Sequence, residues 1–127
     1  MAKKVKKWPY VDGELLKQIK LKFINNNKRI NISKLGREVW KIYLEKDFDL
    51  KGYKNIIEDK GRLKNIAKYD NKVQILMDEE LSNDIDLKVA ELEKKYKDKD
   101  NQYYSITWIT NELLKRLFID EEYDIDI

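Results

Sequence analysis

Apolar residues recur every three to four positions in two stretches of the chain, and the second stretch repeats the first. The segment 12–23 (DGELLKQIKLKF) aligns with the segment 78–89 (DEELSNDIDLKV), and we call this shift from position 12 to position 78 the first offset. Each segment begins with an Asp that can cap a helix and continues with acidic residues that suit the positive end of the helix dipole. Their apolar positions coincide at Leu15 and Leu81, Ile19 and Ile85, Leu21 and Leu87, and Phe23 and Val89. The pattern predicts one amphipathic helix in each segment.

A second pair of helical segments repeats with a larger shift. Residues 31–44 (NISKLGREVWKIYL) align with residues 105–118 (SITWITNELLKRLF), and we call this shift from position 31 to position 105 the second offset. Each segment opens with an N-cap residue, and apolar positions at i, i+3, i+7 and i+11 form one helix face. The second offset is the larger because the second linker is longer, and insertions belong in loops. The predicted face holds Ile32, Leu35, Val39 and Tyr43 in the first copy and Ile106, Ile109, Leu113 and Leu117 in the second.

A short strand pattern precedes the first helix of each copy. These segments are 5–11 (VKKWPYV) and 72–77 (KVQILM). Pro9 has no N–H to donate, so strand pairing must be interrupted or shortened there. Each unit therefore reads strand, helix, helix. Two chance helical hairpins are the alternative, but the shared caps, the shared Glu and Lys positions and the shared element order favour a true repeat.

The two units divide the chain into four parts. Residues 1–45 and 72–118 form the units, 46–71 form a connector, and 119–127 (IDEEYDIDI) form an acidic tail. Apolar spacing in the connector predicts a helix at about 49–59. A unit of about 45 residues cannot bury enough core alone, so we expect the two units to form one intertwined domain. We expect the tail to be mobile, and either to keep the protein soluble or to shield its basic surface.

Composition narrows the function classes. The 127 residues contain no Cys and no His. Disulfides, thiolate nucleophiles and cysteine-based zinc sites are excluded, and so are the commonest general base and metal ligand. The acidic residues show no EF-hand spacing. We therefore expect no enzyme activity, no catalytic residue, no cofactor and no metal.

The net charge of +3 conceals a strong asymmetry. Residues 1–70 hold 19 Lys and Arg against 9 Asp and Glu, a net of +10, whereas residues 71–127 hold 8 against 15, a net of −7. A basic half suggests a polyanionic partner, and a merely solvated surface is the alternative. No apolar run approaches the roughly 20 residues that span a bilayer, and no apolar signal-peptide core follows the basic start. We expect a cytoplasmic protein with no membrane partner.

A short strand that runs into an Asp- and Glu-rich helix start and a second helix resembles the ribbon-helix-helix family of DNA-binding proteins. The resemblance rests on VQILMDEEL (73–81) with SITWITNELLKRL (105–117), and on VDGELL (11–16) with NISKLGREVWKIYL (31–44). It covers roughly residues 4–45 and 72–118. Family members commonly have Gly between the two helices, and here neither linker has one. Asn26, Asn27 and Asn101 can take that role, because Asn tolerates positive φ.

The resemblance implies a fold and a function. The fold is mainly α with a short two-stranded antiparallel ribbon, formed here as a tandem ribbon-helix-helix pseudo-dimer within one chain. Tandem members occur among conjugative-plasmid and archaeal-virus regulators. The Lys-, Ile- and Asn-rich composition looks more like the virus group, for which the cytoplasm would be the host's. The ribbon would enter the major groove of double-stranded DNA. Self-association on DNA is also implied, because family members often bind adjacent sites.

Alternation along the strands assigns the residues that would read bases. In the second strand Val73, Ile75 and Met77 face the helices, so Lys72, Gln74 and Leu76 face outward. Gln can bond adenine, Lys can donate to guanine and Leu can contact a thymine methyl group. The same register in the first strand turns Lys6, Trp8 and Tyr10 outward and Lys7, Pro9 and Val11 inward. A slip of one residue would instead bury Trp8 and Tyr10 and expose Lys7.

Phosphate contacts are expected at the start of each second helix, where free N–H groups and the positive dipole end suit an anion. These starts supply Asn31 and Ser33 in the first unit and Ser105 and Thr107 in the second. Asn31 and Ser105 can also act only as helix caps. Basic residues would reinforce the first site, so we expect the N-terminal unit to supply most of the phosphate affinity. They are Lys4, Lys28 and Arg29.

The sequence thus predicts a sequence-specific, double-stranded DNA-binding transcriptional regulator, either an activator or a repressor. One alternative is a plasmid transfer or partition accessory protein that binds DNA in the same way. Another is a small helical protein-interaction module whose basic half meets an acidic partner. Exposure of Trp40 and Trp108 would favour that module.

Overall fold

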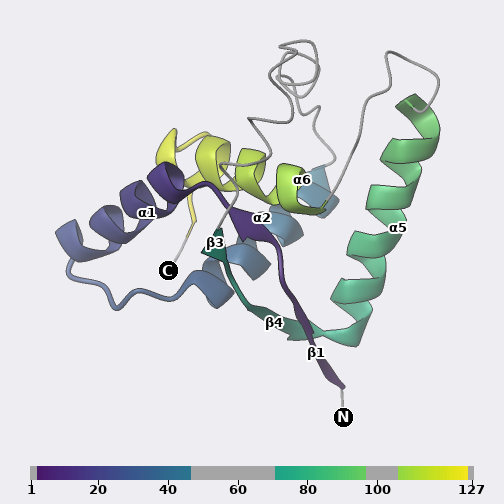
Figure 1. The fold of residues 1–127 in the computed structure, drawn as a ribbon, viewed down its shortest axis with the longest axis horizontal. Helices are drawn as coiled ribbons and strands as arrows, with labels where there is room; N and C mark the ends of the chain where they lie inside the picture. The colour runs from purple at the N-terminus through teal and green to yellow at the C-terminus, as the bar shows by residue number, and fades with distance from the viewer. Residues whose placement is uncertain (1–2, 47–70, 97–105, 126–127) are drawn as a thin grey trace.

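The computed structural model describes residues 3–46, 71–96 and 106–125. Its described part is mainly helical, with two small two-stranded antiparallel sheets (Figure 1). The predicted order of strand, helix and helix occurs twice. The elements are β1 (Lys4–Lys7), β2 (Tyr10–Val11), α1 (Gly13–Asn25), α2 (Ile32–Lys46), β3 (Asn71–Lys72), β4 (Ile75–Asp78), α5 (Glu79–Tyr96), α6 (Ile106–Leu113) and the π-helix η1 (Leu114–Ile119), which continues α6.

The two sheets share one register. β1 pairs with β4 and β2 pairs with β3, and in every pair the two residue numbers add up to 82. Between the sheets the Val73 N–H donates to the Pro9 carbonyl at 3.0 Å, where the same register brings these residues opposite each other. The reciprocal bond would need an N–H that proline lacks. The expected interruption at Pro9 is confirmed, and the four strands form one ribbon with a break in its middle.

The first helix of each unit follows directly from its strand. The Asp12 carboxylate accepts a hydrogen bond of 3.0 Å from the Glu14 N–H and caps α1, as the sequence predicts. Ile19 and Ile85 occupy equivalent positions and both are fully buried. Leu21 and Leu87 also belong to the repeated apolar pattern, yet both lie exposed outside the core.

An asparagine ends the first helix in place of the expected glycine. α1 stops at Asn25, and Asn27 has a φ of 56°, in the left-handed region that Asn tolerates better than other side chains. Asn26 keeps a negative φ and bonds its side chain back to the Lys22 carbonyl at 2.7 Å. The prediction is therefore confirmed for Asn27 and wrong for Asn26, while Asn101 lies outside the described residues.

The second helices form the centre of the molecule. α2 packs against β4, α5, α6 and η1, so one helix of the first unit contacts a strand and all the described helices of the second half of the chain. The buried indole of Trp40 donates to the Thr110 hydroxyl at 2.9 Å, which joins α2 to α6. The two units therefore share a single core. Three of the four predicted face residues are buried in each copy, Leu35, Val39 and Tyr43 in the first and Ile109, Leu113 and Leu117 in the second, while Ile32 and Ile106 are partly buried against the core.

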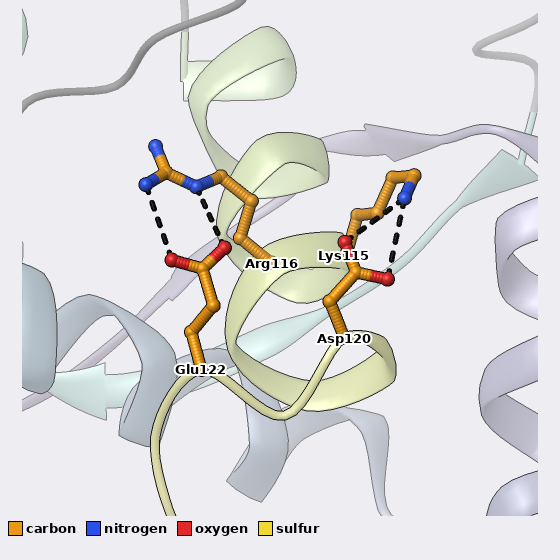
Figure 2. Close-up of polar contacts among 4 residues, drawn as sticks. All are labelled: Lys115, Arg116, Asp120 and Glu122. Atoms are coloured by element: carbon orange, nitrogen blue, oxygen red, sulfur yellow. Dashed lines mark hydrogen bonds and ion pairs between the residues drawn. The ribbon is translucent and has the colours of Figure 1, made fainter.

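The start of the acidic tail is held against the protein. Asp120 accepts from Lys115 at 3.0 Å, and Glu122 accepts from Arg116 at 3.1 and 3.3 Å (Figure 2). Glu121 lies 2.8 Å from Lys22 of α1, whose hydrogen bond and positive charge lower the pKa of Glu121. Tyr123 and Ile125 pack against the core. The structure thus gives residues 119–125 contacts with α1, η1 and the core that the sequence did not predict, and the mobility of the tail stays a prediction.

Some expectations fall outside the described residues. The helix predicted at about 49–59 and the residue Ser105 are among them. Of the helices in the described ranges, none combines the length and the apolar character needed to span a bilayer.

Gly36 in α2 allows this helix to lie close to the ribbon. A Cβ atom at residue 36 would lie 2.6 Å from Cδ1 of Ile75 and 2.8 Å from its Cγ1, and Ile75 is itself buried. Such overpacking costs about 1–3 kcal/mol, whereas the better helix propensity of Ala returns up to about 1 kcal/mol. The overpacking outweighs the gain over most of this range, so we expect Gly36→Ala to lower the free energy of unfolding by up to about 2 kcal/mol in urea titrations. Lys41→Ala, at an exposed position of the same helix, should change it by less than about 0.5 kcal/mol, and equal effects would contradict the prediction.

Candidate nucleic-acid interface

One face of the ribbon carries all six predicted base-reading side chains. Lys6, Trp8 and Tyr10 alternate with half-buried or buried residues in the first strand segment, as do Lys72, Gln74 and Leu76 in the second. Trp8 and Tyr10 are 47% and 43% exposed. Because Pro9 and Val11 are buried on either side of Tyr10, the alternative register that slips by one residue is wrong. We refer to the six side chains as the outer face.

Lys7 points inward without being left as an isolated charge. Its ammonium lies 2.6 Å from the Asp86 carboxylate of α5, and only 15% of its side chain is exposed. The aliphatic stem is thus covered while the charged end reaches an exposed acid, which is how a lysine can occupy a half-buried position. This ion pair also joins the strand of the first unit to the first helix of the second unit.

A pseudo-two-fold axis passes through the middle of the outer face. Trp8 and Gln74 are equivalent positions under the first offset, and their numbers also add up to 82. They therefore lie opposite each other on the axis that relates the two units. On either side of the axis, Lys6 is equivalent to Lys72 and Tyr10 is equivalent to Leu76. The outer face thus repeats a lysine and an apolar residue at each end, with two unlike residues at its centre.

The second helices bind the edges of the ribbon at equivalent points. The Ser33 hydroxyl accepts from the Leu76 N–H at 2.8 Å, and the Arg37 guanidinium donates to the Leu76 carbonyl at 2.7 Å. On the other edge, the Thr107 hydroxyl accepts from the Tyr10 N–H at 3.2 Å, and the Asn111 amide donates to the Tyr10 carbonyl at 2.8 Å.

We call these two pairs of hydrogen bonds, at Leu76 and at Tyr10, the clamps. The two offsets of the repeat relate one clamp to the other. The second offset takes Ser33 to Thr107 and Arg37 to Asn111, and the first offset takes Tyr10 to Leu76. Each clamp joins the second helix of one unit to the strand of the other. The agreement confirms the repeat at the level of individual hydrogen bonds.

Charge on the ribbon is partly compensated. The Lys4 ammonium lies 2.6 Å from the Asp78 carboxylate, its cross-strand partner at the end of the ribbon. Lys72 lies over the Trp8 ring, with its ammonium 5.1 Å from the ring centroid, so Trp8 holds a lysine beside the axis. Lys6 is exposed. Lys4 thus has an acidic partner within the protein, while its side chain stays 62% exposed, and the phosphate contact expected for it stays a prediction.

The predicted phosphate contacts can be followed at the start of α2 and at Thr107 in α6. Asn31 caps α2, because its side-chain oxygen accepts from the Lys34 N–H at 3.0 Å, and it remains exposed. Lys28 and Arg29 are exposed in the loop just before this helix. Ser33 and Thr107 face the ribbon and accept its N–H groups, which leaves each hydroxyl hydrogen as a donor. The start of α2 thus has the Asn31 cap, and the two exposed cations Lys28 and Arg29 lie just before it.

Arg37, Asn111 and Asp78 were not among the predicted site residues, although they shape the outer face. Arg37 and Asn111 are aligned by the second offset, but their side chains differ in size and charge. The signal that could have identified them is two polar residues on otherwise apolar helix faces, one turn after a hydroxyl residue. Asp78 was interpreted only as a helix start.

The Asn111 clamp generates a stability prediction. Its buried side chain accepts from the Asp12 N–H at 2.9 Å and donates to the Tyr10 and Thr107 carbonyls at 2.8 and 2.7 Å. Asn111→Ala would leave these groups without their partner, and we expect a loss of about 1–3 kcal/mol in urea unfolding. Amide exchange at Asp12 should also accelerate. The exposed Asn25→Ala is the matched control, and equal stability of the two variants would contradict the role assigned to Asn111.

The Lys4–Asp78 pair generates a pH prediction. The hydrogen bond and charge of Lys4 lower the pKa of Asp78 below its ordinary value of 3.8. Because the folded state depresses the pKa, the pair stabilises the protein in full above that value, and the stabilisation is lost as the pH falls through the lowered pKa. As the pH falls below 3.8, we expect the urea midpoint of the unsubstituted protein to decrease more than the urea midpoint of Asp78→Asn, which has no carboxylate to protonate at this position. Parallel pH profiles would show that the pair contributes nothing.

Comparisons with protein-family models, with curated proteins and with solved structures found no match to this chain. Within residues 3–46, 71–96 and 106–125, no cluster of three or more potential acidic ligands is placed to hold a metal ion. The candidate interface consists of an accessible two-stranded face held between the starts of two helices.

Proposed function

We propose that this chain is a sequence-specific transcriptional regulator that binds double-stranded DNA as a tandem ribbon-helix-helix pseudo-dimer. The outer face would enter the major groove and contact base edges. The single observation that carries the proposal is that all six side chains chosen for base reading lie on one face of one ribbon, above a buried opposite face. A two-stranded ribbon fits the major groove, where the pattern of donors and acceptors identifies each base pair.

The chemistry of the outer face supports base readout. Gln74 can bond adenine through two hydrogen bonds, and Lys6 and Lys72 can each donate to guanine. Leu76 suits contact with a thymine methyl group, and Tyr10 offers an aromatic surface beside a hydroxyl. Trp8 and Tyr10 lie exposed on the ribbon, and aromatic side chains contribute most to binding when they are covered. DNA would cover them.

The clamps would couple contacts to DNA phosphates with contacts to DNA bases. Ser33 lies in the first turn of α2, next to the exposed Asn31 cap, and binds the ribbon backbone at Leu76. A phosphate held at the start of α2 would therefore be fixed relative to a base read by Leu76 or Gln74. Contacts to phosphates set the position of a protein on the duplex, and contacts to bases set its specificity.

The alternatives differ in what they require. A transfer or partition accessory protein would use the same surface, so it differs in the genomic position of its binding site. Exposure of Trp40 and Trp108 would have favoured a helical protein-interaction module, and they are 0% and 4% exposed. Among the described residues, the exposed Trp8 and Tyr10 lie on the ribbon beside side chains with base-reading chemistry, which favours a DNA-binding function.

The pseudo-axis leads to an expectation about the operator. Equivalent Lys6 and Lys72 lie on opposite sides of the axis, so the two halves of the site should present guanine to lysine as an inverted repeat. Tyr10 and Leu76 differ, as do Trp8 and Gln74, so the inverted repeat should be imperfect. The proposed operator is therefore a short sequence with symmetric outer positions and an asymmetric centre.

A gel-shift titration against the DNA upstream of the chain's own gene, with a scrambled duplex beside it, tests the function. We expect Gln74→Ala to lower the preference for the specific duplex by about 1–3 kcal/mol, or roughly 5- to 150-fold. Lys28→Ala should weaken binding to both duplexes equally and reduce the salt dependence by about one phosphate contact. Each variant is a control for the other.

A charge-matched control separates local contacts from net charge. Lys94 is exposed and lies about four turns after the start of α5, about 20 Å from the ribbon along the helix. Lys94→Ala should bind both duplexes like the unsubstituted protein. Absence of any complex at low salt would contradict DNA binding, and equal binding of all duplexes would contradict base readout.

A further inference from the structure

Two equivalent leucines lie exposed on the outer sides of the first helices. Leu21 of α1 is 47% exposed and Leu87 of α5 is 69% exposed, and the first offset relates them. The pseudo-axis separates the two helices, so they occupy opposite ends of the molecule (Figure 1). An exposed large apolar side chain at the same place on both ends is a feature that neither the core nor the outer face of the ribbon requires.

The charges around the two leucines are opposite. By sequence α1 carries three lysines and one glutamate, whereas α5 carries six acids and three lysines. The difference appears at equivalent exposed positions beside the leucines. One end of the molecule is therefore basic and the other acidic around the same apolar centre. Lys17, Gln18, Lys20 and Asn25 on α1 correspond to Asn83, Asp84, Asp86 and Glu91 on α5.

The two surfaces differ in their apolar side chains, although a hollow lies beside each leucine. Beside Leu21 the side chain of Ile24 projects from α1 and is 57% exposed, whereas the equivalent residue beside Leu87 is the small Ala90. Next to Leu87 the surface forms a shallow hollow between α2 and α5. The apolar projection of α1 thus has a counterpart in a hollow that offers two leucines, two acids and one lysine. The hollow is lined by Leu44, Asp84, Leu87, Lys88 and Glu91.

We infer that copies of this chain associate head to tail, with the α1 surface of one copy seated on the α5 surface of the next. Leu21 and Ile24 fill the hollow beside Leu87, while the lysines around them face the acids around the hollow. The occupant of each patch is a second copy of the same chain. The basic patch consists of Lys17, Lys20, Leu21 and Ile24, and the acidic patch consists of Asp84, Leu87, Ala90 and Glu91.

A two-fold contact between like ends is disfavoured. Two α1 surfaces would bring Lys17 and Lys20 of both copies together, and two α5 surfaces would bring Asp84 and Glu91 together, at a cost from like charges. Because the head-to-tail contact joins different surfaces, a pair of copies keeps one free basic patch on one copy and one free acidic patch on the other. Such a contact does not close on itself and produces an open row of copies. The association needs no DNA, so it stands or falls independently of the proposed function.

Sedimentation velocity of the DNA-free protein tests the inference. We expect the mean mass to rise with protein concentration at low salt, and the rise to be suppressed when the salt is raised roughly tenfold, because the charges lie at the surface. Leu21→Gln with Ile24→Gln removes the basic patch, and Leu87→Gln removes the acidic patch. Each of these variants alone should stay monomeric, because every head-to-tail contact needs both patches.

Mixing the two variants identifies the geometry. A molecule with only its basic patch can seat on a molecule with only its acidic patch, so an equal mixture should form dimers and nothing larger. If the contact were two-fold, one variant alone would still dimerise, and that result would overturn the inference. Monomers in the mixture, or a monomeric unsubstituted protein at every concentration at low salt, would overturn it too.

One further variant tests the contribution of charge, and another controls for the loss of an exposed apolar side chain elsewhere. Lys17→Glu with Lys20→Glu leaves the apolar residues in place and should abolish association by charge alone. Ile30→Gln changes an exposed isoleucine outside both patches and should associate like the unsubstituted protein. Circular dichroism checks that all variants keep their helices. Association of the charge-reversed variant at the unsubstituted level would contradict the assigned contact.

Discussion

The structure depends on the need of a two-stranded ribbon to satisfy the backbone groups along its two free edges. Along this ribbon every second residue turns its N–H and C=O away from the opposite strand, and a ribbon of two strands has no further strand to receive them. Side chains of the second helices receive them at Leu76 and Tyr10. Since each second helix binds the strand of the other unit, neither unit is complete alone. The shared core around α2 follows from the same exchange, because a helix that reaches across to the partner's strand must also pack on its helices.

This arrangement fixes which side chains form the outer face. Inward residues are fixed by burial against the helices, the edges are fixed by the clamps, and the outward residues remain accessible on a backbone that is held on both sides. In the proposed function such a surface would approach DNA with little conformational entropy left to lose, which favours binding. The ion pair of Lys7 with Asp86 contributes in the same way, because it keeps an inward lysine from pulling the strand into the other register.

Much of this architecture could be predicted from the sequence because it depends on periodicity. The helix faces, the Asp12 cap, the interruption at Pro9 and the alternation along the second strand all follow from local patterns and spacings of two or three to four residues. Features that depend on tertiary partners could not be predicted. Arg37 and Asn111 perform equivalent tasks with unlike side chains, and the tail is held by basic residues of α1 and η1 whose pairing requires the fold. Leu21 shows the limit most clearly, since a helix pattern cannot tell an apolar position that is buried from one that is left exposed.

Joining the two units in one chain removes a restriction that symmetric dimers cannot escape. In a homodimer the residues that meet on the two-fold axis must be identical, so the complex is unchanged when it is turned end for end. Here Trp8 meets Gln74 on the pseudo-axis, and the two ends of the outer face pair Lys6 with Leu76 and Lys72 with Tyr10. The surface therefore has a polarity. A protein with such a surface has a distinguishable upstream and downstream side, and its two ends can evolve separate duties while their one-to-one ratio stays fixed by the covalent chain.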